Sequence, residues 1–197
     1  MPRTGIPERF QSYAEYKRHV DVLVKAGLIE DSTKIWWDLR PSGRFPTIEV
    51  RVMDVCTRLD DCIAIVALLI SVVRMLYRLR LAIQRWRLYT TMLIRENRWR
   101  AMRYSFDEGL IDLAKGAVVP VGELLDELIQ LTAEDAEALG CSAEVASLRD
   151  IMTRGTSAHR QLATFSAAKE GGASPEDALK AVVDRLVADT AKDLDAR

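Results

Sequence analysis

Two short segments of alternating polar and apolar residues, 34–40 and 47–53, flank a Pro-Ser-Gly connection and constrain the fold more than any other stretch. Successive side chains of a strand point to opposite faces, so each segment has one apolar and one polar face. If the segments pair as antiparallel strands, the apolar face can join a core. The polar face then brings together four charged side chains: Asp38, Arg40, Glu49 and Arg51.

This polar face has the residue types of a site for metal-bound phosphate. Mg²⁺ prefers hard oxygen ligands and binds through one or two carboxylates and substrate phosphates, so Glu49 is the predicted metal ligand, with Asp38 a second candidate. The planar guanidinium fork matches phosphate oxygens, which assigns phosphate contacts to Arg40 and Arg51. The alternative is a solvated two-stranded ribbon whose charges form cross-strand ion pairs.

Composition favours a soluble globular protein. The 197 residues are 49% hydrophobic and 29% charged, within the size of one domain, and we expect a single domain over 1–197. A net charge of −1 gives no electrostatic reason to expect nucleic acid or an anionic membrane as partner. Three cysteines and two histidines lack metal-ligand spacing, and we find no secretory leader, so we expect a reducing cytoplasmic location without zinc.

Helices are expected on both sides of the strands. Ser12 and Glu15 form a capping-box pattern at the start of a helix that Gly27 ends, after a lead-in that we expect to be irregular. The run 62–73 is uninterrupted by charge, yet a membrane span needs roughly 20 apolar residues. We therefore interpret this run as a buried helix that supports the Glu49 strand from its apolar side.

Arginine and aromatic residues alternate through 80–104, a pattern that can indicate nucleic-acid binding. The acidic last third of the chain returns the net charge to near zero, and Glu96 and Arg100 have the spacing of an ion pair on a solvated helix face. The remaining sequence is predicted to be helical, with stops at Gly140 and Gly155 and a start at Ser174. These elements predict the α+β class: strands within 34–54 and a helical majority.

Several stretches resemble the bacterial carboxylate-amine ligases, the type-2 glutamate–cysteine ligase family. They follow the family order along nearly the whole chain: Ile35-Trp36-Trp37-Asp38-Leu39-Arg40-Pro41-Ser42, Phe45-Pro46-Thr47-Ile48-Glu49-Val50-Arg51-Val52, Asp54-Val55-Cys56-Thr57-Arg58-Leu59-Asp60-Asp61, Glu96-Asn97-Arg98-Trp99-Arg100-Ala101-Met102-Arg103-Tyr104, and Arg154-Gly155-Thr156-Ser157 with Arg160-Gln161-Leu162. The matches cover the C-terminal half of the usual family chain. The Gly-x-Glu-x-Glu strand near the family's N-terminus, which supplies further metal carboxylates, has no counterpart here.

The resemblance implies the C-terminal half of a glutamine-synthetase-like fold and an ATP-dependent reaction with Mg²⁺. ATP would phosphorylate a glutamate-like carboxylate, and an amine such as that of cysteine would attack the acyl phosphate. Asn97, Arg98 and Arg103 match family positions that contact the nucleotide or acidic substrate, with Arg103 favoured. Ser105 and Phe106 replace the usual Gly-Leu. His159 stands where the family tends to have an acidic residue, and we interpret it as a surface histidine.

Two functional classes follow. The chain is either an enzyme half that needs an N-terminal half, or a non-catalytic binding or subunit protein that retains part of the ligase fold. The shared presence of Asp38, Arg40, Glu49 and Arg51 favours the first class, and the missing metal carboxylates favour the second for the chain alone. Unpaired strand edges tend to recruit another strand, so we expect either an N-terminal partner or a homo-oligomer.

Overall fold

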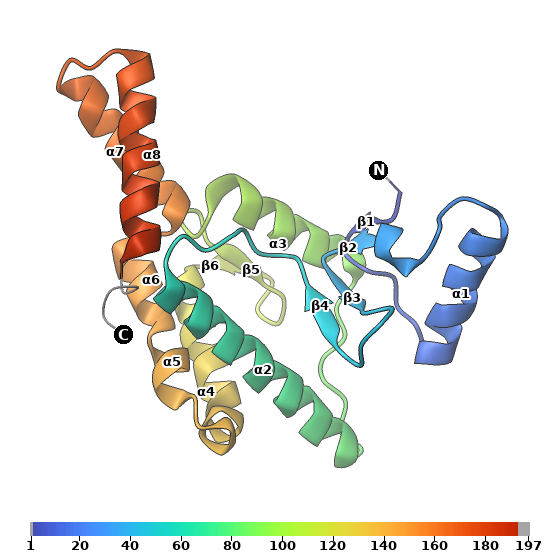
Figure 1. Cartoon of the computed structure of the whole chain (residues 1–197). Helices are drawn as coiled ribbons and strands as arrows, with labels where there is room; N and C mark the ends of the chain where they lie inside the picture. The colour runs from blue at the N-terminus through green and yellow to red at the C-terminus, as the bar shows by residue number, and fades with distance from the viewer. Residues whose placement is uncertain (1, 193–197) are drawn as a thin grey trace. The chain divides into compact units, whose positions relative to one another are not determined.

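The computed structural model describes residues 2–192, and the chain divides into two compact units, 1–55 and 56–197 (Figure 1). Most described residues are helical, and all three sheets are two-stranded. The predicted α+β class with a helical majority is therefore confirmed. The single-domain organisation and the glutamine-synthetase-like topology stay predictions.

Unit 1 contains four short strands and two helices. In chain order they are β1 (Thr4–Gly5), α1 (Tyr13–Lys25), the 3-10 turn η1 (Ser32–Lys34), β2 (Trp36–Trp37), β3 (Leu39–Pro41) and β4 (Ile48–Val50). Strands β3 and β4 pair antiparallel as predicted, and the register places Arg40 opposite Glu49. The lead-in is not wholly irregular, however, because β1 pairs parallel with β2. The first predicted strand is therefore divided between two sheets.

The core of unit 1 forms between α1 and β2. The Ser12 hydroxyl accepts a hydrogen bond from the Glu15 backbone N–H at 3.2 Å, which confirms the predicted start of α1. This start positions an apolar face of α1 over the strand segment. The buried cluster consists of Tyr16, Val20, Ile29 and Ile35, with Phe10, Leu23 and Trp37 packed around it.

The two faces of the β3–β4 hairpin are not buried as predicted. Leu39, Ile48 and Val52 from the expected core face are exposed, whereas Asp38 and Arg40 from the polar face are buried. Alternation determines which residues share a face but not which face is covered. Because the core of unit 1 forms around α1 and β2, the apolar side of the hairpin lies open in the described chain.

Unit 2 is built from helices and one hairpin. The elements are α2 (Leu59–Leu81), α3 (Thr91–Tyr104), β5 (Leu110–Asp112), β6 (Ala117–Val119), α4 (Val121–Leu139), α5 (Ser142–Ala146), α6 (Leu148–Arg154), α7 (Ser157–Glu170) and α8 (Pro175–Ala191). Figure 1 shows α4, α5 and α6 beside α2, and α7 beside α8. The predicted boundaries at Gly140, Gly155 and Ser174 are confirmed, with Gly140 left-handed at a φ of 69°.

The hairpin β5–β6 corrects the prediction that the rest of the chain is helical. Its strands have only three residues each, too short for a clear period of two. The turn between them depends on Asp112, whose carboxylate accepts hydrogen bonds from the backbone N–H groups of Ala114 at 2.8 Å and Lys115 at 3.0 Å. Gly116 then adopts a φ of 68°, which glycine does at little cost.

Helix α2 is the longest element and packs against α4, α5 and α6. Ala64 and Ala67 lie in the core cluster with Ala136, Val145 and Leu148. With 23 residues and a mean hydropathy of 2.1 over its most apolar 18-residue window, α2 is long and apolar enough to cross a membrane by length and composition. Our exclusion of a membrane span on length is therefore wrong, although core helices of soluble proteins can meet the same criterion. Support of the Glu49 strand by this helix stays a prediction.

An ion-pair group fastens α2 to α4. The carboxylate of Asp135 is fully buried and accepts hydrogen bonds from Arg78 at 2.8 Å and 3.2 Å and from Arg74. The hydrogen bond from Arg78 is the largest cause that lowers the pKa of Asp135 below its ordinary value, and Arg74 adds to it against the opposing effect of burial. The carboxylate of Asp135 is therefore ionised at neutral pH.

We expect the ion pairs of Asp135 to make unit 2 less stable as the pH falls into the acid range. Because the pKa of Asp135 is lower in the folded chain than in the unfolded chain, its contribution is present above the unfolded value and is lost as pH falls through the folded value. Asp135→Asn should lower the Tm at pH 7 by roughly 5 °C and flatten the loss of stability below about pH 4. Thermal melts from pH 7 to pH 2 measure both effects. Asp184→Asn, at an exposed position on α8, should change neither.

Candidate active site

The charged face of the β3–β4 hairpin forms one connected ion-pair group. One oxygen of Glu49 accepts hydrogen bonds from Nε and Nη2 of Arg40, each at 2.8 Å, and the other accepts from Nη2 of Arg51 at 2.5 Å. The Arg51 guanidinium also lies over the Trp36 ring, 5.1 Å from its centroid. The hydrogen bond from Arg40 is the main cause that lowers the pKa of Glu49, so this carboxylate is ionised at neutral pH.

Arg40 and Arg51 differ in what remains available for a ligand. Arg40 is only 7% exposed, and its Nη1 donates to the carbonyls of Ser32 at 2.7 Å and Ile35 at 2.8 Å. These contacts fasten the hairpin to the turn before β2. Arg51 is 34% exposed, and its guanidinium donates to Glu49. Of the two predicted phosphate contacts, Arg51 is therefore the accessible one, and Arg40 positions the carboxylate between them.

The described residues do not fit a complete Mg²⁺ site. Within 2–192 there is no group of three or more His, Cys, Asp and Glu side chains that could hold a metal ion. Both oxygens of Glu49 are bonded to arginine, and Asp38 is buried. Mg²⁺ bound in near-octahedral geometry needs more free oxygen ligands than this face supplies. Glu49 can therefore contribute one ligand only if other groups complete the site.

Two of the three predicted residues on α3 have contacts within unit 2. The Asn97 amide donates to the Ile111 carbonyl at 2.8 Å and accepts from the Ile111 N–H at 2.7 Å, so it pairs with β5 as a strand would. Arg98 donates to the Met102 sulfur at 3.1 Å. Arg100, which we expected to pair with Glu96 on a solvated helix face, donates to the carbonyls of Glu108 and Gly109. Asn97 and Arg100 therefore hold the α3–β5 connection in place, whereas the contact of Arg98 lies within α3.

Arg103 lies in a pocket of about 410 Å³ at the end of α3. Its guanidinium stands 5.3 Å from the centroid of the Tyr104 ring, and no carboxylate of the described chain lies within ion-pair distance of it in the structure. The pocket is lined by Met102, Arg103, Tyr104, Ser105, Asp107, Glu108, Ala158, His159 and Leu162. An exposed cation beside two carboxylates can bind a ligand that carries both charges, such as an amino acid.

His159, which we interpreted as a surface histidine, is partly exposed and closes one side of this pocket. It is 27% exposed and stacks on Phe106 with ring centroids 4.5 Å apart. Its Nδ1 accepts from the Thr156 N–H at 3.2 Å, and its Nε2 lies 3.2 Å from the Asp107 carboxylate. Thr156 and His159 thus form a capping box at the start of α7. The imidazole of His159 accepts the hydrogen bond of the N-cap backbone N–H, which a Glu or Gln side chain accepts in the usual capping box.

Ser105 ends α3 in a backbone conformation that favours glycine, with φ 53° and ψ −121°. This geometry explains the glycine that the resembled family has at the position, because only glycine adopts it without steric cost. The turn after α3 places Ser105 in the lining of the Arg103 pocket.

We expect Ser105→Gly to stabilise unit 2. Relief of a strained non-glycine residue is worth on the order of 1 kcal/mol, partly offset by the greater freedom of glycine in the unfolded chain. The free energy of unfolding from urea titration should rise by about 0.5–1 kcal/mol. Ser166→Gly, at an exposed site inside α7, is the matched control and should lower it. Equal losses in both variants would contradict the strain at Ser105.

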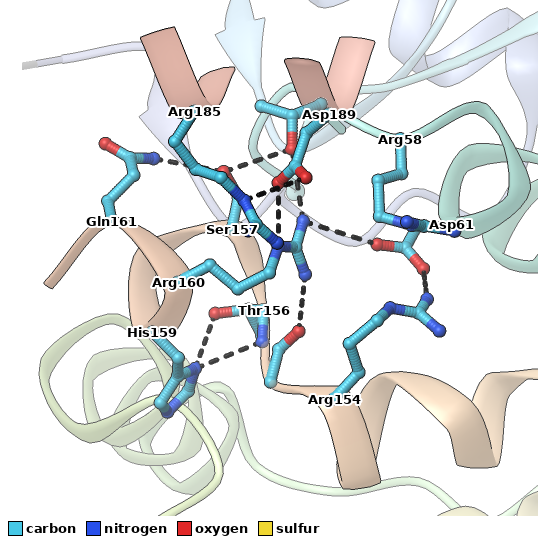
Figure 2. A network of polar contacts seen from close by, with 12 residues as sticks. Arg58, Asp61, Arg154, Thr156, Ser157, His159, Arg160, Gln161, Arg185 and Asp189 are labelled. Carbon is cyan, nitrogen blue, oxygen red and sulfur yellow. Dashed lines mark hydrogen bonds and ion pairs between the residues drawn. The ribbon is translucent and has the colours of Figure 1, made fainter. Parts of the chain in front are cut away.

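A buried polar network connects four parts of unit 2, and our prediction from the sequence missed it (Figure 2). Its centre is Arg160, 8% exposed, which donates to Asp189 at 2.9 Å, to the Gly155 carbonyl at 2.7 Å and to the Thr57 hydroxyl at 3.2 Å. Asp61 at the start of α2 accepts from Arg154 and lies 3.9 Å from Arg160. The two family-like stretches at 154–157 and 160–162 contain Arg154 and Arg160, but the sequence alone does not identify the residues that pair with them.

The sequence of the chain matches one family of known proteins. The model of glutamate-cysteine ligase family 2 matches residues 1–184, which include the hairpin, α3 and Arg160 but not its partner Asp189. Curated relatives carry the name "Putative glutamate--cysteine ligase 2". The protein of Rhodospirillum rubrum is 59% identical over 100% of this chain and 50% of its own length, and those of Jannaschia sp. and Paracoccus denitrificans are 52% and 48% identical over 98% of this chain and 51% of theirs.

The family model and the curated relatives define the class of protein to which this chain belongs. The chain belongs to glutamate-cysteine ligase family 2, and it spans about half the length of the curated relatives it matches. The predicted family is confirmed, and the half-length match agrees with the expected C-terminal half. The roles of Glu49, Arg51, Arg40, Asn97, Arg98 and Arg103 stay predictions.

Proposed function

We propose that this chain is one half of an ATP-dependent carboxylate-amine ligase of the glutamate–cysteine type. The observation that carries the proposal is the family match over 1–184, because it includes both the charged hairpin and the Arg103 pocket. A carboxylate oxygen of the glutamate-like substrate attacks the γ-phosphorus of ATP, and ADP leaves. The amine nitrogen then attacks the acyl carbon, and phosphate leaves with the carboxylate oxygen as the amide forms.

The hairpin would stabilise charge during phosphoryl transfer. Phosphoryl transfer depends on positioning and electrostatic stabilisation more than on acid–base chemistry. Arg51 can turn its fork from Glu49 to a phosphoryl group, while Trp36 and β4 limit its movement. Arg40 keeps the Glu49 carboxylate ionised and in place from the buried side. The carboxylates that a Mg²⁺ site needs besides Glu49 would come from the other half of the ligase.

The Arg103 pocket would hold an amino-acid substrate. The exposed guanidinium of Arg103 suits a substrate carboxylate, and the carboxylates of Asp107 and Glu108 suit an ammonium group. Asn97 supports this pocket by fixing the α3–β5 connection, and Arg98 contacts the pocket residue Met102 on the same helix. The cytoplasm, where ATP and thiol substrates occur together, is the proposed location, in keeping with three free cysteines.

A second candidate is a non-catalytic subunit that retains the ligase fold. The observation that favours it is the absence of a metal-ligand group among residues 2–192. Such a subunit would still bind a partner through its exposed apolar surfaces. It would not change the reaction rate of that partner through Glu49 or Arg51.

The two candidates differ in one assay. The purified 197-residue chain is mixed with the part of the Rhodospirillum rubrum ligase that it does not match, and ADP release is measured with glutamate, cysteine, ATP and Mg²⁺. We expect no appreciable turnover from either part alone and clear turnover from the mixture. Vigorous ligation by the chain alone would refute the need for a second half. A complex that forms without turnover would favour the non-catalytic subunit.

A further inference from the structure

One side of α2 is packed and the opposite side is not. The packed side consists of Ala64, Ala67, Ser71 and Met75, each at most 4% exposed, and it faces the α4–α6 helices. The small side chains allow close approach of the neighbouring helices. Even so, only 22% of the most apolar 18-residue window of α2 is buried. A core helix of this hydropathy is normally covered all round.

The uncovered side forms a continuous apolar stripe, which we call the α2 stripe. Its members recur at alternating spacings of three and four residues and are between 41% and 62% exposed: Ile63, Val66, Ile70, Val73 and Tyr77. This spacing places all five on one face of the helix, as in the seam of a helix–helix contact. No charged residue occurs from Cys62 to Val73. Exposed apolar surface of this extent indicates an interaction site.

A second exposed stripe, on α8, differs from the α2 stripe. Leu179, Val183 and Val187 are also exposed, but charged Lys180 and Asp184 stand beside them. That arrangement is ordinary for a surface helix. The α8 stripe therefore provides a control surface of the same helix type and similar exposure.

We propose that the α2 stripe is the docking surface for the half of the ligase that this chain does not span. This inference rests on the proposed function. The relatives are about twice as long as this chain, so an equal length of family chain is available to cover the stripe. The charges at the two ends of α2 are already engaged within this chain, since Asp60 and Asp61 pair with arginines and Arg78 pairs with Asp135. A partner that offers an apolar surface of similar length therefore fits the stripe.

A lipid bilayer fits the α2 stripe less well. Helix α4 packs directly against α2 and would have to enter the bilayer with it. Ionised side chains inside a bilayer are costly, and α4 carries a series of carboxylates: Glu123, Asp126, Glu127, Glu134, Asp135 and Glu137. The buried pairs of Asp135 with Arg74 and Arg78 tie the two helices together. Separation of α2 from α4 would leave Asp135 without these partners.

Charge introduced into the α2 stripe tests the proposal. Val66→Glu and Ile70→Glu should each weaken binding of the unmatched part of the Rhodospirillum rubrum ligase by at least about 100-fold, because a buried carboxylate without a partner opposes docking. Val183→Glu on α8 and Ile70→Leu in the stripe should change the Kd by less than about threefold. Calorimetric titration measures the Kd, and circular dichroism checks that each variant is folded. Equal binding by Val66→Glu and the unchanged chain would overturn the proposal.

Cys62, exposed at the start of the stripe, reports coverage without any mutation. Labelling by a maleimide, read peptide by peptide, should be fast in the chain alone and at least about tenfold slower in the complex. Unchanged labelling, or absence of binding, would overturn the proposal. Self-association or vesicle binding that Val66→Glu abolishes would overturn it too, because a second copy or lipid would then be the occupant. If the mixture ligates normally and Val66→Glu binds as tightly as the unchanged chain, the docking surface is refuted and the proposed function is not. If the other half docks through the stripe but the complex does not ligate, the proposed function is refuted and the docking surface is not.

Discussion

Arg51→Lys is expected to lower the turnover of the assembled ligase by about 100-fold. Removal of one hydrogen-bond donor to the charge that develops in a transition state has an effect of about this size. Lysine keeps the positive charge but cannot present two parallel N–H groups to a phosphoryl oxygen pair. Because Arg51 is partly exposed and Glu49 is also held by Arg40, the Tm of the chain should change little. ADP release and thermal melting measure the two quantities separately.

Glu49→Gln provides a second test of the same face. It removes the carboxylate charge but keeps an amide oxygen that can accept from Arg40, so a comparable loss of turnover should come with a modest decrease in Tm. Arg44→Lys, in the exposed turn of the same hairpin, is the matched control and should leave turnover and Tm unchanged. Normal turnover by both Arg51→Lys and Glu49→Gln would mean that the hairpin charges form only an ion-pair lattice.

Arg160→Met should cause the largest loss of stability in the chain. The substitution leaves Asp189 and Asp61 in the interior without a buried cation between them, and it removes the bonds to Gly155 and Thr57. Removal of one partner from a buried ion pair costs about 3–5 kcal/mol. Urea unfolding followed by circular dichroism should therefore show a midpoint shifted far below that of the unchanged chain, with α7 and α8 the first helices to lose protection from amide exchange.

Arg185→Met is the control for this prediction. Arg185 also donates to Asp189, at 3.0 Å, but it is about half exposed, so its loss should cost less than about 1 kcal/mol. Asp189→Leu combined with Arg160→Met removes both charges and should recover part of the loss. Similar costs for Arg160→Met and Arg185→Met would show that the network in Figure 2 does not depend on burial.

Local patterns predicted the parts of the fold that depend on neighbouring residues. Alternation along two segments predicted an antiparallel pair with Arg40 and Glu49 on one face, and the structure pairs these two residues directly. The capping pattern at Ser12 and the glycine stop at Gly140 are likewise confirmed. Each of these features is determined within one turn or one strand pair, where side-chain spacing alone carries the information.

Burial could not be predicted in the same way. Arg40 is buried because the chain folds the Ser32 and Ile35 carbonyls over it, and nothing in the alternation identifies these partners. The Arg160 network joins residues about 100 positions apart, such as Thr57 and Arg160, and no local pattern predicts such a pair. The hairpin β5–β6 was missed because its strands are shorter than a recognisable period. In each case the missing information was tertiary contact.

The fate of one carboxylate oxygen of glutamate tests most directly whether ligation proceeds through an acyl phosphate. Glutamate labelled with ¹⁸O in its side-chain carboxylate is given to the assembled ligase with cysteine, ATP and Mg²⁺, and the released inorganic phosphate is analysed by mass spectrometry. An acyl phosphate intermediate transfers one carboxylate oxygen to phosphate, so we expect one ¹⁸O in the phosphate for each amide bond formed. Amide formation that leaves the released phosphate unlabelled, or that places the label in AMP, would contradict ligation through an acyl phosphate.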